Sequence, residues 1–294
     1  MLTLLARCVL CMFGRILFII LFCSIALGIF SVSIGTPALS EYFTAQSQST
    51  TVSLPPMQEE LTTETWGIFD PSTGAIIAGH NIDAQRPIAS ITKLFTATVV
   101  MQSDKKNTDV FITHTDVSTE GRSGKLYVGE HMTLYTLLFP LLIESSNDSA
   151  TAIQRTLGNA FSHSVSEILK EQALNKTSLA DPSGLSVKNI STISDLAVFF
   201  SYIKKTYPHL LDITQLDVYV GVSDGYVNNN PARTLKNFTG GKQGYTEEAK
   251  HTFIGTFVLP HTSKEIGIVL LSSEDVLHDV RGLLAYSEQV GNSF

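Results

Sequence analysis

Cysteine is scarce in this sequence, and its positions exclude disulfide bonds from most of the chain. The three cysteines, Cys8, Cys11 and Cys23, all fall within the first 23 residues. Cys8 and Cys11 have the spacing of a redox or metal pair, but no second pair follows, so incidental cysteines are the simpler interpretation. The remaining residues must fold without covalent cross-links.

Charge of either sign is also limited. Charged residues make up 16% of the sequence, and 27 acidic against 20 basic residues give a net charge of −7 without a basic cluster. Nucleic-acid binding therefore has no electrostatic support. The eight histidines are scattered, with no His-x-His or His-x-x-x-His spacing, so a zinc peptidase is not indicated. We expect no metal and no cofactor.

A long apolar run is present at the N-terminus, where Ile16 to Ile34 contains 19 residues without a charge, after Arg7 and Arg15. Such a run is long enough to span a bilayer, and the basic flank would stay in the cytoplasm. The alternative is a cleaved signal peptide, although no convincing small-x-small site occurs between Ser33 and Ala38. We predict that residues 1–40 form a cytoplasmic stub and transmembrane anchor, or a signal peptide.

The next segment, residues 41–62, is rich in Ser, Thr and Gln and contains Pro55-Pro56. This composition is typical of a flexible linker. Residues 63–294 are long enough for one substantial core, and the motifs described next are spread across them. We therefore predict a single domain over residues 63–294.

Three polar clusters occur in this order: Ser90-Ile91-Thr92-Lys93, Ser145-Ser146-Asn147 and Lys242-Gln243-Gly244. The first alone is weak evidence, because Ser103-x-x-Lys106 and Ser201-x-x-Lys204 share its pattern. Context favours Ser90, which is followed by an apolar, helix-forming run, whereas Ser103 lies in a polar stretch with loop composition.

A serine and a lysine three residues apart on a helix share one face, so the Lys93 amine would reach the Ser90 hydroxyl. An unprotonated amine there can take the proton of an attacking alcohol. Since an ordinary lysine has a pKa of about 10.4, this role requires burial or a second cation, for which Lys242 is the candidate. Taken in isolation, an N-cap serine with a solvated first-turn lysine is the simpler interpretation.

The second cluster lies between two apolar, helix-forming segments, 134–143 and 149–153. Ser145 there would relay a proton between Lys93 and a leaving amine, and the Asn147 amide would bind a substrate carbonyl and steady Lys93. The alternative is an ordinary helix cap, for which Ser and Asn are common residues.

The third cluster has glycines on both sides of Lys242 and precedes two probable strands, 252–259 and 266–271. Glycine lets a ligand approach the backbone closely, as an edge strand that lines a cleft requires. The alternative is a tight glycine turn with an exposed lysine.

Together with the segment Asp181-Pro182-Ser183-Gly184, these clusters make the sequence resemble the low-molecular-mass penicillin-binding proteins, the D-alanyl-D-alanine carboxypeptidase and endopeptidase family, over about residues 65–289. The resemblance implies an α/β (α+β) fold of the serine β-lactamase/DD-peptidase type. A mainly antiparallel sheet of about five strands would be flanked by helices, and a mostly helical lobe would supply Ser90 and Ser145.

The resemblance also implies the roles of the site residues. Ser90, Lys93 and Ser145 would be catalytic, and the substrate would be bound by Asn147, Lys242, Gln243, Gly244 and Tyr245. The backbone N–H groups of Ser90 and Tyr245 would form an oxyanion hole. Peptidoglycan stem peptides and β-lactams would both acylate Ser90, in a catalytic domain held outside the cytoplasm by a single-pass bacterial membrane anchor, or secreted after cleavage.

Gln243 departs from the family, which has Thr or Ser at this position to hydrogen-bond the terminal carboxylate of the substrate. A longer amide side chain would crowd or relocate that carboxylate. A weakly active or non-catalytic cell-wall binding or regulatory protein is therefore the alternative function. A β-lactamase is less favoured, because Glu171, in a Glu-x-x-Leu-Asn segment, is better interpreted as the end of a surface helix.

Overall fold

The computed structural model describes residues 57, 60–121, 124–221, 225–260 and 262–291, which belong to a compact unit between Leu54 and Phe294. The predicted anchor or signal peptide, residues 1–40, lies outside these residues, as does most of the predicted linker. Within the described part of the chain, no helix is both long and apolar enough to cross a membrane.

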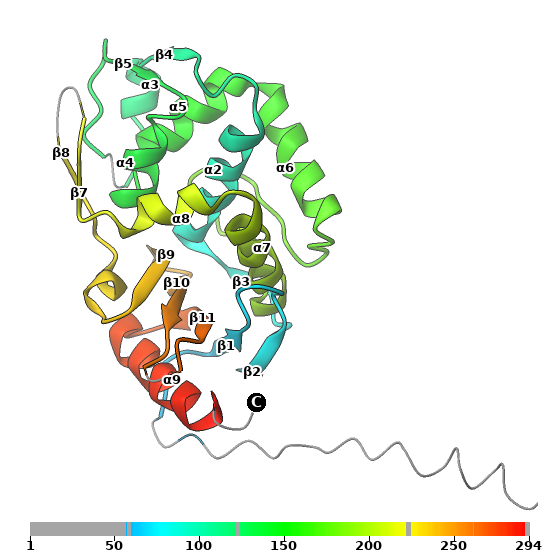
Figure 1. Cartoon of the computed structure of the whole chain (residues 1–294). Coiled ribbons are helices and arrows are strands. Elements are labelled where there is room, and N and C mark those ends of the chain that lie inside the picture. Colours follow the sequence, from blue (N-terminus) through cyan, green and yellow to red (C-terminus); the bar gives the residue numbers. More distant parts are fainter. Residues whose placement is uncertain (1–56, 58–59, 122–123, 222–224, 261, 292–294) are drawn as a thin grey trace, which may run out of the picture. The chain divides into compact units, whose positions relative to one another are not determined.

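A five-stranded antiparallel sheet forms one side of this unit, with the strand order β2-β1-β11-β10-β9 (Figure 1). Its strands come from the two ends of the unit: β1 (Thr65–Phe69), β2 (Ile76–His80), β9 (Phe238–Thr246), β10 (Lys250–Val258) and β11 (Glu265–Ser273). The two strands predicted at 252–259 and 266–271 are both present, as β10 and β11. β9, which carries the third cluster, is an edge strand.

Helix α9 (Val276–Gly291) covers one face of the sheet. Its apolar side chains, spaced three and four residues apart, pack with Ile268 and Leu270 of β11 in a common buried cluster. The start of the described chain is tied to the same helix, because the backbone N–H and the hydroxyl of Thr62 donate to the Asp279 carboxylate at 2.7 and 2.8 Å. The last residue of the predicted linker is thus anchored to α9.

The helical lobe lies on the other side of the sheet (Figure 1). It contains α2 (Thr92–Gln102), α3 (His114–Val117), α4 (Leu138–Ile143), α5 (Asn147–Leu157), α6 (Asn159–Glu171), α7 (Ile193–Thr206) and α8 (Pro208–Gln215). α8 packs beside β9, and α7 packs beside β1 and β11. These two helices connect the lobe to the sheet.

Short elements complete the described fold. The 3₁₀ turns are η1 (Ala89–Ile91) and η2 (Pro231–Thr234), and the paired short strands are β3 (Arg86–Pro87) with β6 (Ile190–Ser191), β4 (Asp109–Phe111) with β5 (His131–Thr133), and β7 (Val218–Val220) with β8 (Gly225–Val227).

Helix α2 runs through the centre of the lobe. Its first nine residues are buried, and Phe95 stacks on Phe199 of α7 with ring centroids 3.6 Å apart. A helix buried on all sides has little freedom to move without disturbing close-packed neighbours. α2 therefore gives rigid support to Lys93 in its first turn and to the η1 turn just before it.

Candidate active site

Ser90 and Lys93 meet at the start of α2. Ser90 lies in η1 rather than in the first α-helical turn, and Ala89 before it adopts a left-handed backbone with φ of 45°. The Lys93 Nζ donates to Ser90 Oγ at 3.0 Å, while the Lys93 side chain is fully buried. Non-glycine residues in this conformation are strained by about 1–3 kcal/mol and cluster at functional sites.

Two further oxygens accept hydrogen bonds from Lys93. Asn147 Oδ1 lies 2.8 Å from Nζ, and the backbone carbonyl of Ser183 lies 2.7 Å from it. A neutral amine keeps two hydrogens and one lone pair. With those hydrogens on Asn147 and Ser183, the lone pair points at the Ser90 hydroxyl, which is the arrangement that a general base needs.

The second cluster forms the turn between α4 and α5. Ser146 is the N-cap of α5, and its hydroxyl accepts from the Ser149 N–H at 3.0 Å. Ser145 adopts a left-handed backbone with φ of 66°, and its Oγ accepts from Lys242 Nζ at 3.0 Å. The cluster is therefore both a helix cap, through Ser146, and a contact between the lobe and the sheet, through Ser145.

The loop at Asp181 packs closely against the η1 turn. The Asp181 carboxylate accepts from the backbone N–H groups of Ser183, Gly184 and Ser186. Burial alone would raise the pKa of Asp181, but these hydrogen bonds and one from the Ser183 hydroxyl outweigh it and hold the pKa below the usual range. Gly184 has φ of 90°, and a Cβ there would lie 1.9 Å from the Ala89 carbonyl oxygen. Only glycine fits, and the folded loop presents the Ser183 carbonyl to Lys93.

Strand β9 approaches Ser90 equally closely from the sheet. A Cβ on Gly244 would lie 2.5 Å from the Ser90 backbone nitrogen. Lys242 is buried and donates to the carbonyl of Gln243 at 2.7 Å as well as to Ser145. The three clusters, far apart in the sequence, therefore converge on one place.

They border a cleft of about 380 Å³. The lining combines residues of all three clusters with residues of flanking loops and strands: Ser90, Gly121, Ser145, Asn147, Gly184, Leu185, Asn229, Gln243, Gly244, Tyr245, Thr246 and His251. Every predicted site residue either lines this cleft or, like Lys93 and Lys242, bonds to a hydroxyl that does. His251, in β10, contacts the exposed Tyr245 ring at a centroid distance of 4.6 Å.

Gln243 does not extend freely into the cleft. Its Nε2 donates to the backbone carbonyl of Asn229 at 2.6 Å and lies 3.5 Å from the Asn229 Oδ1. Asn229 in turn donates through Nδ2 to the Glu144 carbonyl at 2.6 Å, just before Ser145. The amide at the position of the family hydroxyl is therefore held against the lobe.

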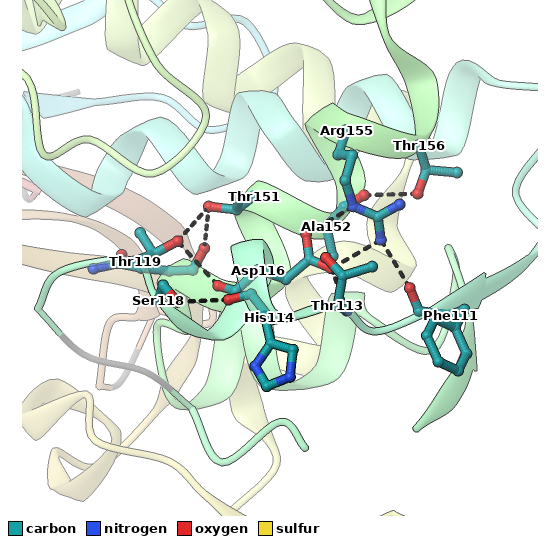
Figure 2. A network of polar contacts seen from close by, with 11 residues as sticks. Phe111, Thr113, His114, Asp116, Ser118, Thr119, Thr151, Ala152, Arg155 and Thr156 are labelled. Atoms are coloured by element: carbon teal, nitrogen blue, oxygen red, sulfur yellow. Dashed lines mark hydrogen bonds and ion pairs between the residues drawn. The ribbon is translucent and has the colours of Figure 1, made fainter. Parts of the chain in front are cut away.

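A polar network around Asp116 connects α5 to α3 and to the residues that follow α3 (Figure 2). Arg155 on α5 donates to both carboxylate oxygens of the fully buried Asp116, at 2.9 and 2.8 Å. Burial would raise the pKa of Asp116, but the hydrogen bonds from Arg155 and Thr113 hold it below the usual range.

The same network continues toward the cleft. Thr119 and Thr151 share a hydrogen bond of 2.9 Å, and Thr151 donates to the Asn147 carbonyl at 3.1 Å. The next residue of the loop, Glu120, accepts from Asn147 Nδ2 at 2.8 Å through its backbone carbonyl. Asn147 is thereby oriented with its oxygen toward Lys93.

Three contributors were missed by sequence reasoning. The carbonyls of Ser183 and Glu120 act through the backbone, which leaves no residue-type signal, although the Asp181–Gly184 segment marked the loop itself. Asn229 lies in a run of three asparagines. Such a run indicates a polar turn, but it does not indicate that Asn229 contacts Gln243. Glu171, by contrast, is exposed at the end of α6 and does not line the cleft.

The profile of a protein family, D-alanyl-D-alanine carboxypeptidase (peptidase family S11), matches residues 48–272. The chain belongs to this family. It is 27% identical over 222 residues to a D-alanyl-D-alanine endopeptidase of Haemophilus influenzae, covering 71% of this chain and 75% of the relative. It is also 29% identical over 202 residues to a D-alanyl-D-alanine carboxypeptidase of Mycobacterium tuberculosis, covering 65% and 69%.

Solved structures agree on the fold. The crystal structure of a D-alanyl-D-alanine carboxypeptidase from Mycobacterium tuberculosis superposes with a TM-score of 0.74 at 23% identity, covering 83% of this chain and 95% of that one. The Streptomyces K15 DD-transpeptidase superposes with a TM-score of 0.72 at 19% identity, covering 80% and 99%. The predicted α+β fold with a five-stranded antiparallel sheet is confirmed.

Proposed function

We propose that this chain is a serine DD-peptidase that cleaves D-alanyl-D-alanine bonds in peptidoglycan stem peptides, as a carboxypeptidase or endopeptidase, with Ser90 as its nucleophile. The observation that carries the proposal is the 3.0 Å contact between Ser90 Oγ and the buried Lys93 Nζ. Membership of the D-alanyl-D-alanine carboxypeptidase family supports it independently.

In the proposed reaction, Ser90 Oγ attacks the carbonyl carbon of the scissile bond as Lys93 Nζ takes the hydroxyl proton. The oxyanion that forms accepts hydrogen bonds from the backbone N–H groups of Ser90 and Tyr245, and one such donor is worth about 3 kcal/mol in the transition state. β9 lies next to Ser90, because a Cβ on Gly244 would lie only 2.5 Å from the Ser90 backbone nitrogen.

Collapse of this intermediate breaks the C–N bond and needs a proton on the leaving nitrogen. Ser145, which is hydrogen-bonded to Lys242, delivers a proton to the leaving amine and is resupplied from Lys93. Asn147 holds Lys93 through Oδ1 and retains one amide hydrogen for a substrate carbonyl, since the other is donated to Glu120. Water then hydrolyses the ester on Ser90. Because no glutamate is among the described residues that line the cleft, a penicilloyl ester would persist, which makes β-lactams inhibitors.

The test is covalent labelling of the full chain with a fluorescent penicillin over a long incubation, followed by mass spectrometry of the labelled peptide. We expect one adduct on Ser90, and we expect Ser90→Ala to abolish it. Ser103→Ala is the matched control, because Ser103 begins a second Ser-x-x-Lys pattern outside the cleft. Labelling that survives in Ser90→Ala, or is absent from folded wild-type protein, contradicts the proposal.

The cellular location follows from the same proposal. A peptidase of peptidoglycan acts outside the cytoplasm, so the catalytic domain would be extracytoplasmic. The apolar run from Ile16 to Ile34 supports a single-pass membrane anchor, with secretion after cleavage as the alternative. Separating membranes from the soluble fraction, with the N-terminal residue of the mature chain determined, distinguishes the two.

A non-catalytic or weakly active wall-binding protein is the second candidate, and Gln243 is the observation that favours it. Release of D-alanine from a stem peptide, measured in wild type and in Ser90→Ala, separates the candidates. Equal release by both proteins supports the non-catalytic function.

A further inference from the structure

Ser145, Asn229 and Gln243 form one end of the cleft, called the Ser145 end. The side-chain amides of Asn229 and Gln243 have no role in the proton transfers of the proposed mechanism. Under the proposed function, on which this inference rests, Ser145 protonates the leaving nitrogen. The substituents on that nitrogen must therefore lie at the Ser145 end. This is where the last residue of a substrate places its α-carboxyl group.

Each side-chain amide at this end donates an N–H group to a backbone carbonyl of the protein. Gln243 Nε2 donates to the Asn229 carbonyl at 2.6 Å, and Asn229 Nδ2 donates to the Glu144 carbonyl at 2.6 Å. The Asn229 backbone is fixed as well, since its N–H donates to the Ile143 carbonyl at 3.3 Å. The two amides are therefore clamped to the α4–α5 turn.

Their oxygens are left for a ligand. Gln243 Oε1 has no hydrogen-bond partner in the described chain and is not among its buried unpaired atoms, so it is open to solvent in the cleft. Asn229 Oδ1 has only the long 3.5 Å contact from Gln243. An amide oxygen can accept but cannot donate.

Among the residues that the structure describes, no lysine or arginine side chain lines the cleft. The buried Lys242 is already hydrogen-bonded to Ser145 and to the Gln243 carbonyl. A carboxylate placed here would face acceptor oxygens, whereas a neutral amide would donate its N–H to them.

We propose that the Gln243–Asn229 pair selects substrates whose leaving residue carries an amide in place of a free carboxylate. The amide comes either from an amidated leaving residue or from a peptide bond that continues the chain beyond it. Gln243 is thus a specificity-determining residue for an internal or amidated D-alanyl bond.

Three matched substrates test this selectivity: diacetyl-L-lysyl-D-alanyl-D-alanine, its C-terminal carboxamide, and the same peptide extended by glycine. All three break the same D-alanyl-D-alanine bond, and chromatography measures the released D-alanine, D-alaninamide or D-alanylglycine. We expect kcat/KM for both amide substrates to exceed that for the acid by about 10-fold, the discrimination that one mismatched buried polar contact provides. A larger value for the carboxamide than for the glycine-extended peptide identifies amidation as the source, and the reverse identifies an internal bond.

Two substitutions move the preference in opposite directions. Gln243→Thr restores a hydroxyl donor and is expected to raise kcat/KM for the acid, and the rate of penicillin acylation, by about 10-fold. Gln243→Glu keeps an oxygen but adds negative charge, so it should widen the preference for amides. Gln85→Thr, on an exposed glutamine away from the cleft, is the matched control and should change neither.

The results separate this inference from the proposed function. If wild type cleaves the acid as well as the amides, or if Gln243→Thr changes all three substrates equally, the selectivity is wrong while Ser90 chemistry stands. If no substrate is cleaved and Ser90 carries no adduct, the proposed function fails and this inference fails with it. Thermal unfolding of each variant distinguishes a lost preference from a lost fold.

Discussion

The helical wall of the cleft, formed by Ser90, Lys93, Ser145 and Asn147, holds its polar side chains with many short hydrogen bonds. The sheet wall, formed by residues 242–245 of β9, lines the cleft with the Gln243 amide, the Gly244 backbone and the exposed Tyr245. Lys93 Nζ alone lies within hydrogen-bonding distance, 2.7–3.0 Å, of three oxygens of the lobe. On the sheet wall, by contrast, the family hydroxyl is replaced by Gln243, which is held to Asn229.

This difference assigns two properties of the cleft, proton transfer and substrate selection, to different walls. In the proposed mechanism, the helical wall contains the groups that move protons, whose positions tolerate little change. The sheet wall would contact the parts of the substrate that distinguish one peptide from another. A substitution at Gln243 can therefore alter which bond is cleaved and leave the Ser90–Lys93 pair in place.

The largest effect should come from the helical wall. Lys93→Met keeps the length of a buried side chain but removes the base, so we expect the acylation rate of Ser90 to fall by about 10³-fold. Stopped-flow or timed mass spectrometry of the adduct measures this rate. Lys106→Met, at the exposed lysine of the second Ser-x-x-Lys pattern, is the control and should acylate normally. An acylation rate within a factor of about three of wild type would show that Lys93 is not the base.

Sequence patterns located the four residues of the helical wall because side-chain chemistry and spacing identify them. They also placed β9 at the edge of a sheet, since glycines flank Lys242 ahead of two strand-like segments. They did not reveal the Ser183 and Glu120 carbonyls, because every residue has one and only the folded loop selects these two. The Gln243–Asn229 contact was equally hidden, since it depends on how two distant turns meet.

On the sheet wall, adding a single methyl group at Gly244 should slow the acylation of Ser90. In Gly244→Ala the new Cβ would lie 2.5 Å from the Ser90 nitrogen and 2.7 Å from Thr252 Oγ1, so β9 or η1 must shift. The shift separates the two proposed oxyanion donors, and we expect acylation to slow by about 10²-fold. Gly225→Ala, where a Cβ would meet nothing within 4 Å, is the matched control. Normal acylation by a well-folded Gly244→Ala protein would mean that this close approach is unimportant.

The smallest predicted effect concerns the one place in the described lobe where buried polar side-chain atoms have no hydrogen-bond partner. Both carboxylate oxygens of Asp148, next to Asn147, are in this state, as is Ser149 Oγ. Burial, with a smaller contribution from the Asp116 charge, raises the pKa of Asp148 to about 7. Because the fold favours the neutral carboxyl, Asp148 reduces stability progressively as the pH rises from the unfolded value of about 3.9 through about 7.

Asp148→Asn keeps the shape of this side chain and removes the ionisation. We therefore expect the variant to gain stability relative to wild type as the pH rises, by about 2 kcal/mol more at pH 8 than at pH 5. Urea unfolding at the two pH values measures this difference, and Asp104→Asn, on the exposed surface, should show none. A gain that is the same at both pH values would mean that Asp148 is already ionised at pH 5 or finds a partner in solution. In either case the Asp148 carboxylate, next to the helical wall, would be solvated or paired rather than held as a buried neutral acid.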